Sequence, residues 1–251
     1  MTYCVAASID EGFILVSDSR TNAGIDNVST HGKMHVFNTN YDRKIILLCA
    51  GNLATTQAVL EQLHRDKLKN AKINVNNVEC LSEAAAYLGQ VSVDKQNQHI
   101  NAQGLSAFNV SATFILAGQI GNEPHAVYMV YSEGNSITTS AHTPFLQIGE
   151  NKYGKPILDR FLRLNTPLDE AARCCLVSMD STMRSNASVG APVELLIYRK
   201  NSFSLENYYC FDDDDDYMLQ LRRNWETKLK EAIAALPVLS KEFARTIRAE
   251  L

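Results

Sequence analysis

The sequence lacks any long apolar run. The longest apolar stretches, such as Ile45 to Ala50, are far too short for a helix that crosses a bilayer. No Lys or Arg precedes an apolar segment near the N-terminus, and Asp10 and Glu11 come too early for a signal peptide. We therefore expect a cytoplasmic protein.

An excess of positive charge is also missing. The 251 residues include 24 Lys and Arg against 28 Asp and Glu, for a net charge of -4. Nucleic acids and anionic membranes require a basic face, so neither is expected as the main partner. A small molecule, a peptide or a protein is the better candidate for a substrate.

The sequence contains no Cys-x-x-Cys pair and no Gly-x-Ser-x-Gly motif. Several of its six cysteines fall inside apolar runs, which is typical of reduced core thiols. His31 and His35 have no Glu or Cys nearby in sequence to complete a zinc site, and the five aspartates 212–216 lack the Gly and the alternate spacing of a calcium loop. We expect no metal and no cofactor. The cysteines are Cys4, Cys49, Cys80, Cys174, Cys175 and Cys210.

Strand patterns occur in separate groups along the chain. Tyr3–Ile9 and Phe13–Ser17 surround an Asp-Glu-Gly turn and predict a hairpin that delivers Asp18 at its end. The other predicted strands are Lys33–Phe37, Lys44–Ala50, Thr113–Ala117, Ala126–Tyr131, Ser136–Thr139, Pro192–Tyr198 and Ser204–Phe211.

Helix patterns fall between these groups. We expect helices over Leu53–Lys67, from an N-cap at Ser82 toward Asp94, over Lys155–Leu164, and from Asp169 toward Met183. For the last of these, Thr166 is the expected cap, with Pro167 at the first helical position. The polar stretch Lys95–Gln103 is expected to be a loop.

The order of strands, two helices, strands, two helices and strands indicates an α+β layered domain with antiparallel pairing. The remaining segment, 212–251, predicts a C-terminal helical extension of the same structural unit. Its apolar residues Leu221, Trp225, Leu229, Ile233 and Leu236 recur at helical spacing before Pro237, and Lys241–Ala249 predicts a shorter second helix. The apolar face needs a cover, either the domain's own surface or a neighbouring subunit.

Thr2 directly follows the initiator Met1. Removal of Met1 would give Thr2 a free amine beside its hydroxyl, which combines a nucleophile with its own base. A Lys near that hydroxyl would lower the pKa of both groups, and a carboxylate behind the Lys would keep it charged and oriented. Asp18 and Lys33 lie at strand ends that a hairpin sheet can bring beside Thr2. Gly51, before a helix, offers a backbone N–H for an oxyanion.

Together, Thr2, Asp18-Ser19-Arg20, Lys33 and Ala50-Gly51 resemble the catalytic elements of proteasome-type β subunits, which are N-terminal nucleophile hydrolases. The segments 1–5, 17–24 and 180–186 look more narrowly like Anbu, the bacterial "ancestral beta subunit" branch. The resemblance covers Thr2 to about Phe211. It implies an αββα four-layer sandwich over residues 1–211.

The resemblance also implies roles for individual residues. Thr2 would be nucleophile and base, Lys33 the activating charge, and Asp18 the group that holds Lys33. Gly51 would form the oxyanion hole, and Arg20 would be structural. The implied substrate-binding residues are Thr21, Asn22, Cys49 and Leu53.

Two positions depart from the proteasome pattern. Gly149-Glu150 stands where β subunits carry Gly-Ser near the nucleophile's amine, and a substitute role for Glu150 stays open. Ser185-Asn186-Ala187-Ser188 stands where they carry Asp-x-x-Ser, so Ser188 matches as a catalytic position while the Asp has become Ser185.

The expected function is a threonine-type peptidase or amide hydrolase in a homo-oligomer, with a ring or an open helical assembly implied by the resemblance. Two alternatives stay open: an assembly subunit without catalysis, and a hydrolase of small amides or short peptides. The substrate is expected to be a peptide or protein, and the question of an unidentified ATPase partner stays open.

Overall fold

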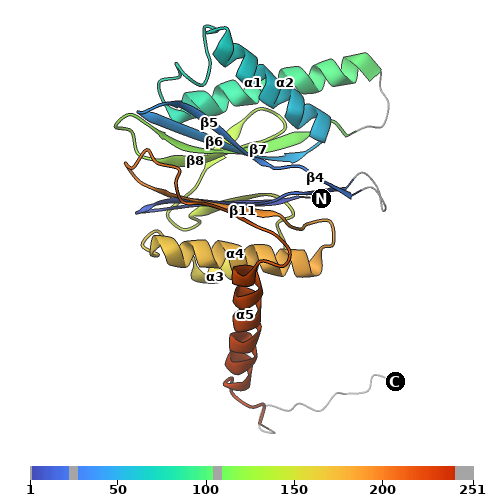
Figure 1. The fold of residues 1–251 in the computed structure, drawn as a ribbon, viewed down its shortest axis with the longest axis vertical. Helices are drawn as coiled ribbons and strands as arrows, with labels where there is room; N and C mark the ends of the chain where they lie inside the picture. Colours follow the sequence, from blue (N-terminus) through green and yellow to red (C-terminus); the bar gives the residue numbers. More distant parts are fainter. Residues whose placement is uncertain (1, 23–27, 104–108, 241–251) are drawn as a thin grey trace, which may run out of the picture.

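The computed structural model describes residues 2–22, 28–103 and 109–240. They form four layers, with a helix pair on each outer side of two stacked sheets (Figure 1). The predicted α+β class and the αββα sandwich are confirmed. No helix in the described ranges is both long and apolar enough to cross a membrane.

One sheet has the strand order β10-β1-β2-β11-β12, with all neighbours antiparallel. Its strands β1 and β2 are the predicted N-terminal hairpin, and β11 and β12 are the predicted C-terminal one. The bounds are β1 Tyr3–Ile9, β2 Gly12–Asp18, β10 Phe145–Gly149, β11 Val193–Arg199 and β12 Tyr208–Phe211.

The other large sheet has the order β5-β6-β7-β8-β9. Its bounds are β5 Met34–Asn40, β6 Arg43–Gly51, β7 Ala112–Ile120, β8 Ala126–Val130 and β9 Ser136–Thr138. A short ribbon of β3 Arg20–Asn22 and β4 Val28–Thr30 follows β2. The ribbon and β10 were not predicted from the sequence.

Three apolar cores hold the layers together. The central core lies between the sheets, where Ala6 and Leu15 of one sheet and Ile46 and Ile115 of the other are all buried. The two outer cores lie between each sheet and its helices. The middle strands are therefore buried on both faces, which explains their nearly continuous apolar sequences.

Helices α1 and α2 cover the β5–β9 sheet, and α3 and α4 cover the other one (Figure 1). Their bounds are α1 Leu53–Leu68, α2 Leu81–Gln103, α3 Lys155–Phe161 and α4 Leu168–Ser185. On α4, Leu168, Ala172, Cys175 and Met179 form one buried stripe at helical spacing.

Helix α2 corrects two predictions. It begins at Leu81, so Ser82 is its second residue and does not cap it. It also continues through Lys95–Gln103, which was expected to be a loop. Gln96 donates to the Ser132 carbonyl at 2.8 Å, and Lys95 Nζ donates to Gln62 Oε1 on α1 at 3.0 Å. These tertiary bonds stabilise helix in a segment whose composition suggests a loop.

The start of α4 was predicted one position too early. Pro167 is the N-cap, and the helix begins at Leu168. The hydroxyl of Thr166 accepts the N–H of Arg163 at 2.9 Å, so it closes the preceding turn instead of capping the helix.

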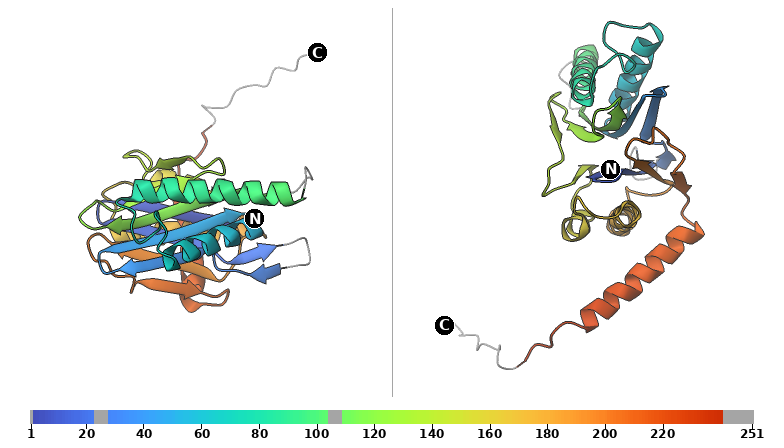
Figure 2. Two further views of the ribbon diagram at one scale, coloured as in Figure 1. Left: turned by 90° about the horizontal axis from the view of Figure 1, so that it is seen from above. Right: turned by 90° about the vertical axis from the view of Figure 1, so that its left-hand side faces the viewer.

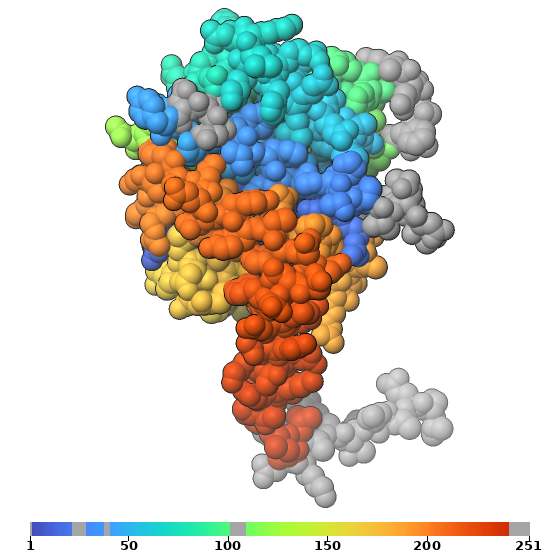
Figure 3. Space-filling model, in the orientation of Figure 1, coloured from blue at the N-terminus to red at the C-terminus, as the bar shows by residue number. Residues whose placement is uncertain are grey.

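Helix α5, Asp216–Ala234, is the predicted extension. It leaves the body beside α4 and projects away from it (Figures 2 and 3). Met218 at its base is buried, while Leu229 and Ile233 are 47% and 63% exposed. The domain's own surface therefore does not cover the outer half of this helix. The second helix predicted over Lys241–Ala249 lies outside the described residues.

All six cysteines are free thiols. The prediction of core thiols is confirmed for Cys4, Cys49, Cys174 and Cys175, which are buried. It is wrong for Cys210, which is exposed on β12 at the sheet edge.

Candidate active site

Asp18 and Lys33 meet as an ion pair, with Lys33 Nζ 2.9 Å from Asp18 Oδ1. Asp18 is the last residue of β2, and Lys33 directly precedes β5 on the other sheet. Lys33 Nζ also donates to the Arg20 carbonyl at 2.6 Å. Both members are buried, at 0% and 6% exposed, so the ammonium is held between a carboxylate and a carbonyl with little water.

The Asp18 carboxylate has two further donors. The Tyr3 N–H reaches Oδ1 at 3.0 Å, and the Gly190 N–H reaches Oδ2 at 3.3 Å. Burial raises the pKa of Asp18 above its ordinary value, and Lys33 and the two N–H groups oppose that rise. Asp18 thus joins three chain segments: the start of β1, the Lys33 side chain and the loop before β11.

A cavity of about 160 Å³ opens beside this pair. Six predicted residues line it: Thr2, Thr21, Lys33, Cys49, Gly51 and Leu53. The structure thus brings together four separate parts of the chain. The other lining residues are His31, Gly32, His35, Ala50, Thr56, Gln57 and Leu60. The sequence analysis had named Ala50 beside Gly51 and had considered His31 and His35 only as a zinc pair, and it had not singled out the remaining four.

Gly51 ends β6 with φ +111°, and it is exposed at the cavity. A Cβ at this position would collide with the carbonyl of Ser111, the residue directly before β7. Asn52 then caps α1, because its side-chain oxygen accepts the Thr55 N–H at 3.1 Å. Glycine is required here by both conformation and close packing.

Thr2 is held through its carbonyl, which accepts the Glu150 N–H at 2.6 Å. Gly149, at φ +81°, packs against the same peptide so closely that a Cβ would overlap the Thr2 carbonyl oxygen. The Glu150 side chain is 8% exposed. It accepts the Lys152 N–H at 2.9 Å and the Asn186 amide at 3.2 Å. Glu150 thus connects the strand end beside Thr2 to the end of α4.

Two predicted site residues, Ser188 and Asn22, are not among the residues described as lining the cavity. Ser188 lies in the loop after α4, where its N–H donates to the Asn186 side chain at 3.0 Å, and it is not among the cavity-lining residues of the described part. Asn22 ends β3, where its backbone pairs with Val28. Its side chain lies outside the described part of the structure.

Glu194 is a buried carboxylate that sequence reasoning missed. It is 9% exposed and accepts from Ser17 Oγ at 3.2 Å, the Lys33 N–H at 3.4 Å and Tyr208 OH at 2.8 Å. Burial, and then this carboxylate, raise the pKa of Tyr208. A charged residue inside the apolar run 193–196 was the signal that could have found it.

His35 and Cys49 form the neutral wall of the cavity, with Cys49 Sγ 3.7 Å from His35 Nε2. Burial lowers the pKa of His35, and it raises the pKa of Cys49 to about 12. Both side chains are therefore uncharged at neutral pH, and the wall favours an uncharged group. Within the ranges 2–22, 28–103 and 109–240, no three His, Cys, Asp or Glu side chains gather as metal ligands.

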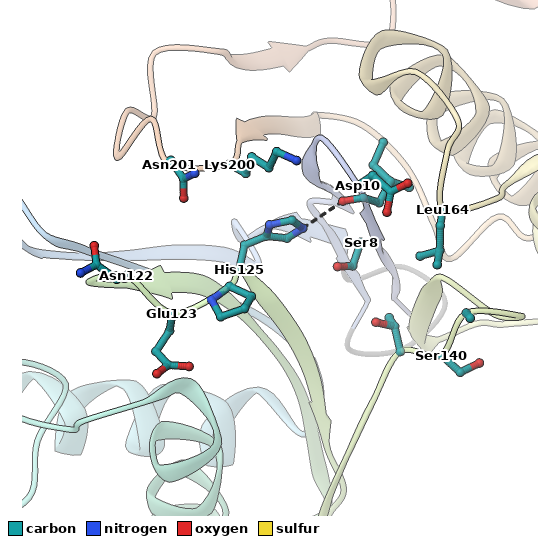
Figure 4. A pocket seen from close by; sticks show the side chains of 13 residues that line it. Ser8, Asp10, Asn122, Glu123, His125, Ser140, Leu164, Lys200 and Asn201 are labelled. Carbon is teal, nitrogen blue, oxygen red and sulfur yellow. Dashed lines mark hydrogen bonds between the residues drawn. The ribbon is translucent and has the colours of Figure 1, made fainter.

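A larger cavity, of about 580 Å³, lies at the opposite end of the sandwich between several loops (Figure 4). It contains Ser8, Asp10 and His125, which invites comparison with a catalytic triad. The ring nitrogen Nε2 of His125 is 3.0 Å from the Ile9 carbonyl and must donate to it. In the described part of the chain no hydrogen bond joins Ser8 to either ring nitrogen of His125, so the Lys33 cavity is the better candidate.

The model of the family described as Proteasome subunit matches residues 2–198. The structure "Anbu (ancestral beta-subunit)" from Yersinia bercovieri is 42% identical, with a TM-score of 0.89 over 95% of this chain and 100% of that one. The chain belongs to the Anbu branch of the proteasome family. No curated protein sequence matches the chain.

Two further Anbu structures are similar. The helical assembly of the Anbu complex from Pseudomonas aeruginosa is 40% identical with a TM-score of 0.90, over 97% of this chain and 100% of that one. An Anbu mutant from Hyphomicrobium sp. strain MC1 is 35% identical with a TM-score of 0.88, over 96% of this chain and 100% of that one. The similarity to these three Anbu structures covers 95% to 97% of this chain.

Proposed function

We propose that the chain is a threonine-type amide hydrolase of the cytoplasm whose nucleophile is Thr2, freed by removal of Met1. The observation that carries the proposal is the buried Lys33 ammonium, fixed by Asp18 at 2.9 Å and the Arg20 carbonyl at 2.6 Å beside a cavity that Thr2 lines. A buried cation at this place stabilises negative charge on a hydroxyl.

In the proposed reaction the Thr2 hydroxyl attacks an amide carbonyl, and its proton passes to the Thr2 α-amine, whose ordinary pKa is about 7.7 to 8.0. The amine then gives the proton to the leaving nitrogen as the C–N bond breaks. The Gly51 N–H stabilises the oxyanion. An ester on Thr2 remains, and water activated by the same amine hydrolyses it.

The volume and lining of the cavity favour a substrate with a medium-sized, uncharged side chain before the scissile bond. Its volume of about 160 Å³ is small, and Cys49, Leu53 and the neutral His35 line it. We therefore propose peptides with a medium-sized apolar residue as substrates. Hydrolysis of small amides or short peptides uses the same atoms, and the size of the assembly's opening decides between it and protein degradation.

The proposed assembly is a homo-oligomer, either a ring or an open helix. The helical assembly of the Pseudomonas aeruginosa relative supports it, as does the uncovered apolar face of α5. An assembly subunit without catalysis is the competing function, and the intact Asp18–Lys33 pair favours the hydrolase over it. An ATPase partner is compatible with either function.

Intact-mass analysis before and after treatment with a peptide epoxyketone tests the proposal. We expect the native protein to lack Met1 and to gain one adduct. Thr2→Ala should lose both the adduct and peptide hydrolysis, Thr2→Ser should retain some of each, and the distant control Thr227→Ala should behave as wild type. Full hydrolysis by Thr2→Ala, or a native protein that keeps Met1, would overturn the nucleophile assignment.

A further inference from the structure

The groups that hold the Lys33 ammonium are connected through neighbouring contacts to the base of α5. These groups are the Asp18 carboxylate and the Arg20 carbonyl, and the position of the carbonyl depends on the loop 187–190. The N–H groups of Ser19 and Arg20 both donate to the Gly190 carbonyl at 3.2 Å, while the Gly190 N–H supports Asp18. A shift of this loop would therefore move both groups that hold the Lys33 ammonium.

The Arg20 side chain clamps the same loop. Its guanidinium lies against Gly190 so closely that a Cβ there would overlap it, and Nη1 donates to the Ala187 carbonyl at 3.0 Å. Arg20 thus fixes the loop with its side chain and holds Lys33 with its backbone.

One ion pair connects Arg20 to the segment before α5, and a second connects α5 to α4, which leads into the loop 187–190. Arg20 Nη2 is 3.8 Å from Asp213, three residues before the helix. Arg222, on the second turn of α5, is 2.7 Å from Asp180 of α4, whose side chain is 6% exposed. The Asp213 pair is exposed and weak, so the Arg222–Asp180 pair is the stronger anchor.

A cavity of about 320 Å³ separates these elements, and Arg20, Gly190, Asp180 and Arg222 all line it. Arg20 and the loop 187–190 are therefore not closely packed against α5. Across this space the Arg222–Asp180 pair holds α5 against α4, and the Arg20–Asp213 pair links Arg20 to the segment before α5. Apolar packing by Met218 holds the start of the helix.

We propose that Arg20 is a positioning residue that transmits the docking of α5 to Lys33, so that a displaced α5 lowers the reactivity of Thr2. The inference rests on the proposed function, because it assigns Lys33 the activation of Thr2. It extends that function by making the catalytic rate depend on a helix outside the sandwich.

A double-mutant cycle in the full chain tests it. The variants are Arg20→Gln, Arg222→Gln and the combination, with Arg223→Gln as the matched control, since Arg223 is exposed on the same helix turn. We expect each single variant to lower kcat for a fluorogenic peptide by about 2- to 30-fold, the usual range for coupling through a contact network. KM should be unchanged, because the cavity lining is intact.

The combination should lower kcat no further than the worse single variant, since both act through one path. Arg222→Lys should recover most of the rate, because an ammonium can also pair with Asp180. Effects that multiply in the double variant, a change confined to KM, or wild-type kcat in Arg222→Gln would each overturn the coupling.

Two controls make the result decisive. Rates are compared at equal particle mass by light scattering, and Arg20→Lys replaces Arg20→Gln in the cycle if the latter does not fold, since an ammonium lacks the guanidinium fork that contacts Ala187 and Gly190. Thr2→Ala is measured in parallel. If it abolishes hydrolysis while Arg222→Gln matches wild type, the coupling fails and the nucleophile stands. If Thr2→Ala keeps its activity, the proposed function itself fails.

Discussion

At the scale of single residues, the Asp18–Lys33 ion pair both orients the Lys33 ammonium and contributes strongly to the free energy of unfolding. Lys33→Met would leave the Asp18 carboxylate buried at 0% exposure without its cation. We expect a loss of about 3 to 5 kcal/mol in the free energy of unfolding, measured by urea denaturation. The double variant Asp18→Asn with Lys33→Met should lose less, because it leaves no charge buried. A double variant as unstable as the sum of the two single ones would contradict this account.

The raised pKa of Asp18 sets the pH dependence. As the pH falls, protonation of Asp18 removes the charge that orients Lys33, so activity should decline. Because burial raises this pKa, the decline should begin above the ordinary Asp range near about 3.9. For stability the sign is opposite: the folded state binds this proton more readily, so the group favours folding as the pH falls through its folded pKa.

A pH profile of kcat checks this assignment. The residual activity of Asp18→Asn should lack the acid limb that wild type shows. An unchanged limb in Asp18→Asn would assign the titration to another group.

Gly149 offers a second test at residue scale. Gly149→Ala places a methyl group on the Thr2 carbonyl, whereas the control Gly121→Ala also has positive φ, at +52°, but meets nothing within 4 Å. Both variants should lose about 1 to 2 kcal/mol from the left-handed backbone. Only Gly149→Ala should also lose activity, by about 10²-fold, because it displaces the nucleophile. Thermal unfolding and peptide hydrolysis, measured together, separate the two effects.

At the scale of elements, Gln119 on β7 holds together the loops farthest from the candidate active site. It is 1% exposed, accepts from Tyr198 OH and the Asn201 N–H at 2.8 Å each, and donates to the Glu123 carbonyl at 3.0 Å. Gln119→Leu should cost about 1 to 3 kcal/mol for each buried group left unpaired.

Activity should be unchanged in Gln119→Leu, since the site lies at the other end of the strands. The exposed Gln90→Leu on α2 serves as the control, with little expected change in stability. Loss of kcat without loss of stability in Gln119→Leu would show that the two ends of the sandwich are coupled.

Most elements followed from the sequence because their local patterns reflect burial. The nearly continuous apolar runs of β1 and β2 indicate strands buried on both faces, and the apolar stripe of α4 indicates a helix with one buried face. The end of α2 did not follow, because Gln96 is stabilised by the Ser132 carbonyl, which is distant in sequence. Strand β10 has only five residues and forms by pairing with β1, so it carries little signal of its own.

The same distinction applies to the candidate site. Asp18, Lys33 and Gly51 stand at strand ends, and strand ends can be read from local patterns. The contacts of Glu194 and of the loop 187–190 arise from pairing between β2 and β11, whose register no local pattern reveals. Sequence therefore predicted the residues beside the ammonium better than those that hold them in place.

At the scale of the whole molecule, α5 leaves an apolar face without a cover. Leu229→Glu with Ile233→Glu should lower the particle mass measured by light scattering, because charges on this face oppose burial against a second copy. Thr227→Glu, exposed on the same helix, is the control. An unchanged mass in the double variant would place the assembly contact elsewhere on the chain.

The position of β1 has a consequence for how fast different parts of the molecule open. This strand lies between β10 and β2, and Tyr3 to Ala7 are at 0% exposure. Its amides should exchange with deuterium only on global unfolding, while those of the outer half of α5 should exchange within the first time points. The first residues of the chain would then belong to its slowest-exchanging segment, so thermal motion displaces Thr2 less than it displaces a terminus held by a surface loop.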